Sequence, residues 1–161
     1  MKQSIEETRH AALARFGAAI ESAHLDGAAA VVGCCADTIR FEDPISRVNG
    51  LEGVQRVFDD TWRLQPGSRF RVRRQALSGN RGLTRWSLVR ERSGAEISLV
   101  EAIGESTFDE AGRIVHHVDY WDSVQAAYRR VPLLGRILEL IRRRISSGWE
   151  PAQPQATTPV T

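Results

Sequence analysis

Cysteine is scarce in this sequence, and its only two cysteines, Cys34 and Cys35, are neighbours. A disulfide between adjacent residues is strained, so we expect two free thiols of the kind that a reducing cytoplasm maintains. No histidine or further cysteine lies at metal-ligand spacing from the pair, and we expect no metal site there. The pair therefore favours buried thiols in a cytoplasmic protein.

Long hydrophobic runs and an excess of one charge are also lacking. No apolar segment approaches the length that spans a membrane. Residues 1–10, MKQSIEETRH, lack the apolar core of a signal peptide. The net charge of +2 gives no general argument for a nucleic-acid partner. With 161 residues, of which 42% are hydrophobic, we expect one globular domain with a sizeable core.

The apolar residues change their period along the chain, and this change predicts the order of helices and strands. Helical spacing predicts helices over residues 4–22, 25–35 and 51–64, and Ser4 with Glu7 forms a capping box at the first. Alternation predicts strands over residues 37–43, 68–78, 83–92, 96–108 and 113–122. Four consecutive antiparallel strands after three helices indicate an α+β fold with helices on one face of a curved sheet.

Two of the predicted strands carry the residues best suited to chemistry. Residues 112–122, GRIVHHVDYWD, combine two histidines, two acids and two large aromatic residues. On the strand 37–43, alternation puts Ile39, Phe41 and Asp43 on one face. A carboxylate that ends an apolar face is unusual, because burying an unpaired charge is unfavourable. We therefore expect these strands to face each other across a small-molecule pocket.

The element order and several segments together resemble the nuclear transport factor 2-like (cystatin-like) superfamily, which includes ketosteroid isomerase and the SnoaL-like proteins. The segments are residues 14–27 (ARFGAAIESAHLDG), 41–44 (FEDP) and 111–115 (AGRIV), with Gly50, Val54 and Phe58 in the third helix. The resemblance covers about residues 5–122. It implies a cone-shaped, curved antiparallel sheet wrapped around the N-terminal helices, and a homodimer through the outer face of that sheet.

The resemblance also assigns places to individual residues. Asp43 takes the place of the general base of ketosteroid isomerase. Five residues take places that line the pocket: Trp86, Leu88, His117, Asp119 and Trp121. The two oxyanion donors of that enzyme, which is a worked example of pKa tuning, are absent, because Phe16 and Gly104 stand in their places. Losing one such donor lowers the rate by on the order of a hundredfold or more, so we exclude steroid isomerase activity.

Asp43 and Asp119 would converge on one cavity as an acid–base pair, with His117 as the orienting residue. Two carboxylates in an apolar pocket repel each other, which raises one pKa. The alternative is structural: Asp119 accepts hydrogen bonds from His117 or Trp86, and Asp43 caps the turn at Pro44. His116 and His117 point to opposite faces of a strand and cannot both bind one metal ion, so we expect no metal site.

The aromatic residues give a second set of candidates. Those for substrate binding, together with Leu88, are Phe16, Phe58, Trp62, Trp86 and Trp121. Most aromatic residues at such spacing belong to a plain core, and Trp86 and Trp121 are the best candidates for ligand contact. A row of arginines, Arg69, Arg71 and Arg73, is expected to be solvated or paired with acids of a neighbouring strand.

Beyond residues 1–122, we expect a helical extension over residues 123–147 and a disordered tail over residues 148–161. The Leu/Ile stripe of the extension favours packing over the pocket mouth or a second subunit rather than a membrane surface. The resulting hypothesis is a cytoplasmic SnoaL-like enzyme. It would use no cofactor and would isomerise, dehydrate, cyclise or hydrolyse a hydrophobic small molecule. A non-catalytic ligand-binding or assembly module is the alternative.

Overall fold

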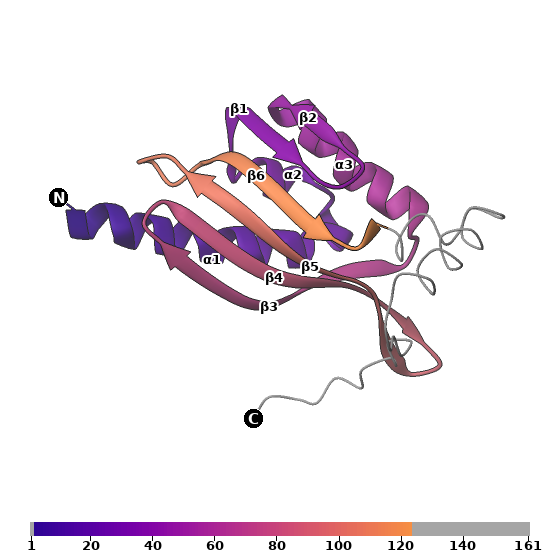
Figure 1. The fold of residues 1–161 in the computed structure, drawn as a ribbon. Helices are drawn as coiled ribbons and strands as arrows, with labels where there is room; N and C mark the ends of the chain where they lie inside the picture. Colours follow the sequence, from indigo (N-terminus) through magenta and orange to yellow (C-terminus); the bar gives the residue numbers. More distant parts are fainter. Residues whose placement is uncertain (1, 124–161) are drawn as a thin grey trace, which may run out of the picture.

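A six-stranded sheet with helices packed against one face forms the body of the protein (Figure 1). The computed structural model describes residues 2–123, and the expected extension and tail therefore lie outside the described residues, apart from residue 123. The helices of this part are α1 (Lys2–Asp26), α2 (Ala29–Val32) and α3 (Gly50–Leu64). The strands are β1 (Cys35–Glu42), β2 (Arg47–Asn49), β3 (Ser68–Ser78), β4 (Arg81–Arg92), β5 (Ala95–Phe108) and β6 (Ile114–Trp121). The α+β class is confirmed.

The expectation of an antiparallel sheet is wrong in one respect. The strand order is β2-β1-β6-β5-β4-β3, and β3 to β6 form the expected antiparallel meander. However, β1 pairs with β6 in parallel, with Phe41 opposite His117. The expectation that these two strands face each other across a pocket is therefore wrong, because they lie side by side in one sheet. The sheet is mixed because the chain leaves β1, passes through α3 and re-enters at the opposite edge, so that the last strand meets the first in the same direction. The short β2 has too few residues to show a pattern and was not predicted.

The N-terminal helices differ from the prediction at their ends. The first helix, α1, already includes Lys2 and continues to Asp26, so Ser4 lies inside it and the expected capping box is wrong. Gly27 follows with a φ of +75°, a conformation that favours glycine, and α1 ends there. The second helix is only the four residues of α2. Runs of small apolar residues suit a helix and a buried strand alike, which explains why the prediction ran on into β1.

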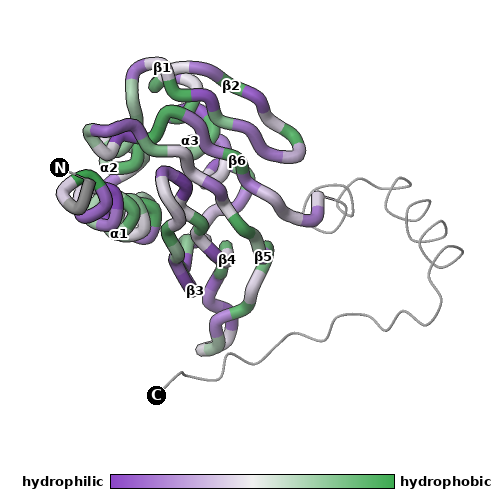
Figure 2. Tube along the Cα trace, turned by 60° about the vertical axis from the view of Figure 1, so that its left-hand side comes forward, coloured by the Kyte–Doolittle hydropathy of each residue, from purple (hydrophilic) through white to green (hydrophobic). Residues whose placement is uncertain are grey.

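The core lies between α1 and the inner face of the sheet. Leu13, Phe16 and Ile20 of α1 are buried there, together with Phe108 and Ile114 of the sheet. Figure 2 shows hydrophobic and hydrophilic residues interspersed along the strands, as expected for a sheet with one covered face. Among the described residues, no helix is long and apolar enough to cross a membrane.

Polar contacts fix α1 against β3. The carboxylate of Glu21 accepts a hydrogen bond from the backbone N–H of Val72 at 3.0 Å, beside an irregularity in the β3–β4 register. The side-chain amide of Gln75 donates to the carbonyl of Leu13 at 2.8 Å. These bonds satisfy groups that would otherwise be unpaired next to the core. They hold the helix that forms one wall of the site described below.

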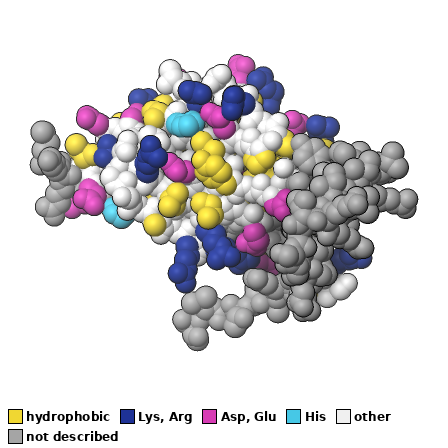
Figure 3. Space-filling model, in the orientation of Figure 1, with side chains coloured by type: hydrophobic (Ala, Val, Ile, Leu, Met, Phe, Trp, Pro, Cys, Tyr) yellow, Lys and Arg dark blue, Asp and Glu magenta, His cyan; other side chains and the backbone are white. Residues whose placement is uncertain are grey.

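The outer face of the sheet carries paired charges, and Figure 3 shows basic, acidic and apolar side chains interspersed on one face of the protein. Arg69, Arg71 and Arg73 all contact Glu96 of β5, at 2.9, 3.3 and 3.3 Å. Of the two expected alternatives, the row is paired rather than simply solvated, but its partner lies on β5 and not on the neighbouring strand β4.

Candidate functional site

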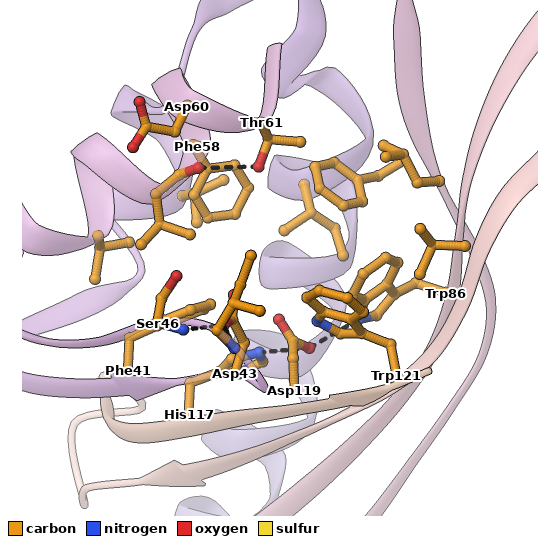
Figure 4. A pocket seen from close by; sticks show the side chains of 18 of the residues that line it. Phe41, Asp43, Ser46, Phe58, Asp60, Thr61, Trp86, His117, Asp119 and Trp121 are labelled. Carbon is orange, nitrogen blue, oxygen red and sulfur yellow. Dashed lines mark hydrogen bonds and ion pairs between the residues drawn. The ribbon is translucent and has the colours of Figure 1, made fainter. Parts of the chain in front are cut away.

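A cavity of about 530 Å³ lies between the inner face of the sheet and the helices (Figure 4). Its lining is mostly apolar, with a group of polar residues on the side formed by β1 and β6. Eight of the nine predicted site residues line it: Phe16, Asp43, Phe58, Trp86, Leu88, His117, Asp119 and Trp121. Trp62 does not, and packs against Phe58 and Phe70 with ring centroids 5.7 and 6.2 Å away.

The alternation of β6 brings its functional residues into the cavity. His117, Asp119 and Trp121 are two residues apart, and all three line the cavity. His116 points the other way and contacts the carboxylate of Glu42 at 3.3 Å. The prediction that the two histidines point to opposite faces is therefore confirmed.

Asp119 is held by two neutral donors. Its Oδ1 accepts hydrogen bonds from Nε1 of Trp86 at 2.9 Å and from Nε2 of His117 at 3.1 Å (Figure 4). Its side chain is only 12% exposed, so these bonds replace those that water would otherwise provide. The predicted structural role of Asp119 is thus present, and the same carboxylate also lies at the cavity surface.

Gly104 makes this arrangement possible. It lies opposite Asp119 on β5, between β6 and Trp86 of β4. A Cβ at this position would lie 2.7 Å from Oδ1 of Asp119 and 2.9 Å from Cε1 of His117. A carboxylate of β6 lies over a glycine of β5.

His117 is buried in a fixed orientation. Its ring stacks on Phe41 with centroids 5.4 Å apart, and Phe16 meets its face edge-on at 5.3 Å. Nδ1 lies 2.8 Å from Oγ of Ser106, which is fully buried. With Nε2–H donating to Asp119, Nδ1 of the neutral ring accepts the Ser106 hydroxyl proton. The hydrogen bonds thus form a chain from Ser106 through His117 to Asp119.

Ser106 was not predicted, although its position held a signal. It is two residues from Gly104 and two from Phe108, so strand alternation places it on the inner face. It also lies directly opposite His117 in the β5–β6 register. Without that register, a buried serine on a strand has no distinguishing pattern. Ser46, Thr61 and Gln65 line the cavity as well and were likewise not predicted as site residues.

Asp43 both caps a turn and lines the cavity. Its Oδ1 accepts hydrogen bonds from the backbone N–H groups of Ile45 and Ser46. Burial raises the pKa of Asp43 above its ordinary value, and the charge of Asp119 adds to this rise, although the backbone hydrogen bonds oppose it. Both predicted roles of Asp43, at the turn and at the cavity, therefore have a structural basis.

The two cysteines are free, as expected. Cys34 is buried, whereas Cys35 lines the cavity. Burial, together with the neighbouring Cys34, raises the pKa of Cys35 to about 12. A thiol with this pKa stays protonated at neutral pH, so Cys35 forms part of the apolar wall and is not an activated nucleophile.

Comparisons with known proteins agree on the fold. A SnoaL-like family protein from Agrobacterium tumefaciens, suggested to be an isomerase, matches with a TM-score of 0.60 and 19% identity, over 72% of this chain and 98% of that one. An NTF2-like protein of unknown function from Burkholderia xenovorans has a TM-score of 0.54 and 19% identity, with 90% and 98% covered. Another from Cytophaga hutchinsonii has a TM-score of 0.52 and 16% identity, with 71% and 90% covered.

These identities are low, so the solved structures establish the fold alone. No match was found among curated proteins. The model of the SnoaL-like domain matches residues 13–117. This range includes α1 from Leu13 onward, α2, α3, all of β1 to β5, and β6 as far as His117. Because the match covers more than half of the chain, this protein belongs to the SnoaL-like domain family.

Proposed function

We propose that this protein is a cofactor-independent acid–base enzyme that acts on a hydrophobic small molecule, by isomerisation, dehydration, cyclisation or hydrolysis. One observation carries the proposal: two carboxylates with different surroundings line a single apolar cavity. Different surroundings separate the pKa values of two acids and let one hold a proton while the other stays charged. The similar Agrobacterium protein, suggested to be an isomerase, is compatible with this reaction class.

Asp43 is the group that moves the proton in this proposal. Its raised pKa brings it closer to neutral pH, where a general base exchanges protons most effectively. It would remove a proton from the substrate, or from an attacking water in a hydrolysis, and return it at a second atom or to a leaving group. The backbone hydrogen bonds from Ile45 and Ser46 keep the carboxylate in place during both steps.

Asp119 and His117 have the complementary role. The donors Trp86 and His117 hold Oδ1 of Asp119 as an acceptor, so this carboxylate keeps its orientation while Asp43 changes its protonation. No oxyanion donor is needed for dehydration or hydrolysis steps that develop positive rather than enolate charge.

Titration of the carboxyl carbons by NMR tests this proposal. We expect Asp43 to titrate above its ordinary pKa of about 3.8, and Asp119→Asn to lower that value because it removes a neighbouring negative charge. The matched control is Asp59→Asn, which removes an exposed charge of α3 outside the cavity. Two ordinary, independent values for Asp43 and Asp119 would contradict the acid–base pair.

A non-catalytic ligand-binding module is the second candidate. The hydrogen bonds of Oδ1 in both acids favour it, because each carboxylate already has a structural task. Native mass spectrometry of freshly purified protein would identify a co-purified ligand. Conversion of that ligand by the wild type but not by Asp43→Asn would support the enzyme, and binding without conversion would support the module.

A further inference from the structure

The charge of the cavity lining restricts the ligand beyond its hydrophobic character. Among the described residues, three acids line the cavity, Asp43, Asp60 and Asp119, and no lysine or arginine does. Asp60 is neutralised from outside the cavity, because it pairs with Arg63 at 2.9 Å and its side chain is 59% exposed. In the described part, neither Asp43 nor Asp119 accepts a hydrogen bond from a lysine or arginine side chain. The polar side of the cavity is therefore negative.

His117 does not balance this charge. Its contacts with Ser106 and Asp119 fit a neutral ring with Nε2 protonated, and a ring protonated on both nitrogens would cancel only one of the two carboxylate charges. The remaining contacts of the ring are aromatic, from Phe16 and Phe41. An anionic ligand in this cavity would meet two carboxylates at short range in a medium of low dielectric, where repulsion is strong.

One oxygen of Asp119 is directed at the ligand space. Trp86 and His117 both donate to Oδ1, and Oδ2 has no hydrogen-bond partner among the described residues. Figure 4 shows this second oxygen pointing into the cavity, with Asp43 beside it. A carboxylate oxygen that lines a cavity can accept a hydrogen bond from a donor of the occupant. A protonated amine supplies up to three such donors, whereas an alcohol supplies one.

The walls beside the acids suit a cation as well. Trp121 and Trp86 adjoin Asp119 in the cavity. The faces of aromatic rings attract a cationic nitrogen, most strongly those of tryptophan. A cation between the acids would also relieve the repulsion that Asp119 exerts on ionised Asp43. The apolar remainder of the cavity would hold the hydrocarbon part of the same molecule.

We propose that the ligand of this cavity is a hydrophobic amine, bound in its protonated form with the ammonium group against Asp43 and Asp119. The inference rests on the proposed function, because it assumes that the cavity is the ligand site. It adds a ligand class, and it excludes carboxylate and phosphate substrates of similar shape.

Three probes with one hydrocarbon body test the charge preference in the full chain: 2-(2-naphthyl)ethylamine, 2-(2-naphthyl)ethanol and 2-naphthylacetic acid. Binding is followed by calorimetry at neutral pH, and the indole N–H signal of Trp86 in NMR spectra reports the location. We expect the amine to bind at least about tenfold tighter than the alcohol, because its hydrogen bonds are charge-assisted, and the acid to bind more weakly than both.

Variants assign the preference to the two acids. Asp119→Asn and Asp43→Asn should each reduce the advantage of the amine over the alcohol by several fold, and the NMR spectrum of each variant shows whether it is folded. Asp59→Asn should leave that advantage unchanged, since Asp59 lies outside the cavity lining. Using two variants keeps the test valid if one of them does not fold.

The outcomes separate this inference from the proposed function. An alcohol that shifts the Trp86 signal and binds as tightly as the amine would overturn the amine inference and leave the cavity as the ligand site. Tighter binding of the acid would overturn it more directly. Failure of all three probes to shift the Trp86 signal would overturn this inference and also count against a ligand site in the cavity.

Discussion

The two faces of the sheet hold charged side chains in opposite ways. On the inner face, Asp119 is largely buried and accepts its hydrogen bonds from the neutral groups of Trp86 and His117. On the outer face, Glu96 contacts three arginines whose side chains are 25 to 43% exposed. The inner carboxylate, Asp119, therefore has no lysine or arginine as a partner, whereas the outer carboxylate, Glu96, has three arginines.

This difference has an energetic consequence. Outer-face ions that lose a partner are solvated by nearby water, so each pair contributes little to stability. Inner-face donors that lose Asp119 are largely buried, so the loss of this acceptor carries a larger desolvation penalty.

Removing the central acid of each face should give the largest contrast. Asp119→Ala leaves the N–H groups of Trp86 and His117 without an acceptor, which destabilises the fold by about 1–3 kcal/mol for each donor. Glu96→Ala should destabilise it by no more than about 1 kcal/mol. Urea unfolding of both variants measures the two effects. An equal or larger loss of stability in Glu96→Ala would contradict the claim that the inner acid contributes more than the outer one.

Adding a methyl group beneath Asp119 should have the next largest effect. Gly104→Ala places a Cβ 2.7 Å from Oδ1 of Asp119, and overpacking of this kind destabilises by about 1–3 kcal/mol. In the Asp119→Ala background the clash with the carboxylate is gone. The double variant should therefore be less destabilised than the sum of the single variants, since the two residues are in contact. Additive free energies of unfolding would show that Gly104 has no role in placing Asp119.

The pH dependence of stability should have opposite signs on the two faces. Burial raises the pKa of Asp43 above 3.8, so its stabilising contribution is complete below that value and is lost as pH rises through the folded-state pKa. For Glu96, burial acts in the same direction, but the contacts with Arg71 and Arg69 outweigh it and lower the pKa below 4.5. Its contribution is present above that value and is lost as pH falls through the folded-state pKa.

The variants Asp43→Asn and Glu96→Gln isolate these contributions, because each removes the charge and keeps an acceptor oxygen. As pH rises from about 3 to 7, Asp43→Asn should gain stability relative to the wild type, and Glu96→Gln should lose it. Urea midpoints at several pH values measure both trends. If the stability of both variants relative to the wild type changed in the same direction with pH, the two faces would not have pKa shifts of opposite sign.

Strand periodicity and the family resemblance together explain why most of the site could be predicted. Alternation placed Asp43 on the apolar face of its strand, the resemblance assigned His117 and Asp119 to the pocket, and the structure brings all three to one cavity. Alternation follows from the geometry of the strand backbone, so the face on which a side chain lies can be predicted without knowing the tertiary contacts. The helical stripe of α3 was predicted for the same reason, and Val54 and Phe58 are buried as expected.

Pairing between distant segments could not be predicted in this way. The parallel contact of β1 with β6 depends on the path of the chain around α3, and no local pattern encodes it. Ser106 was not predicted for the same reason, because its pairing with His117 follows only from the β5–β6 register. Trp62 shows a different limit, because helical spacing gives its side of α3 but not whether Phe58 and Phe70 stand between it and the cavity.

The smallest expected effect concerns the far end of the inner hydrogen-bond chain. Ser106→Ala removes the partner of Nδ1 of His117, and the fold should lose about 0.5–1.5 kcal/mol. The outer-face counterpart is Ser87→Ala, which removes the acceptor of Nε of Arg73 at 3.0 Å. Only the inner variant should change the ¹⁵N shifts of His117, because Ser106 fixes which ring nitrogen carries the proton. Unchanged His117 shifts in Ser106→Ala would show that Asp119 alone sets the tautomer, and the chain would then end at His117.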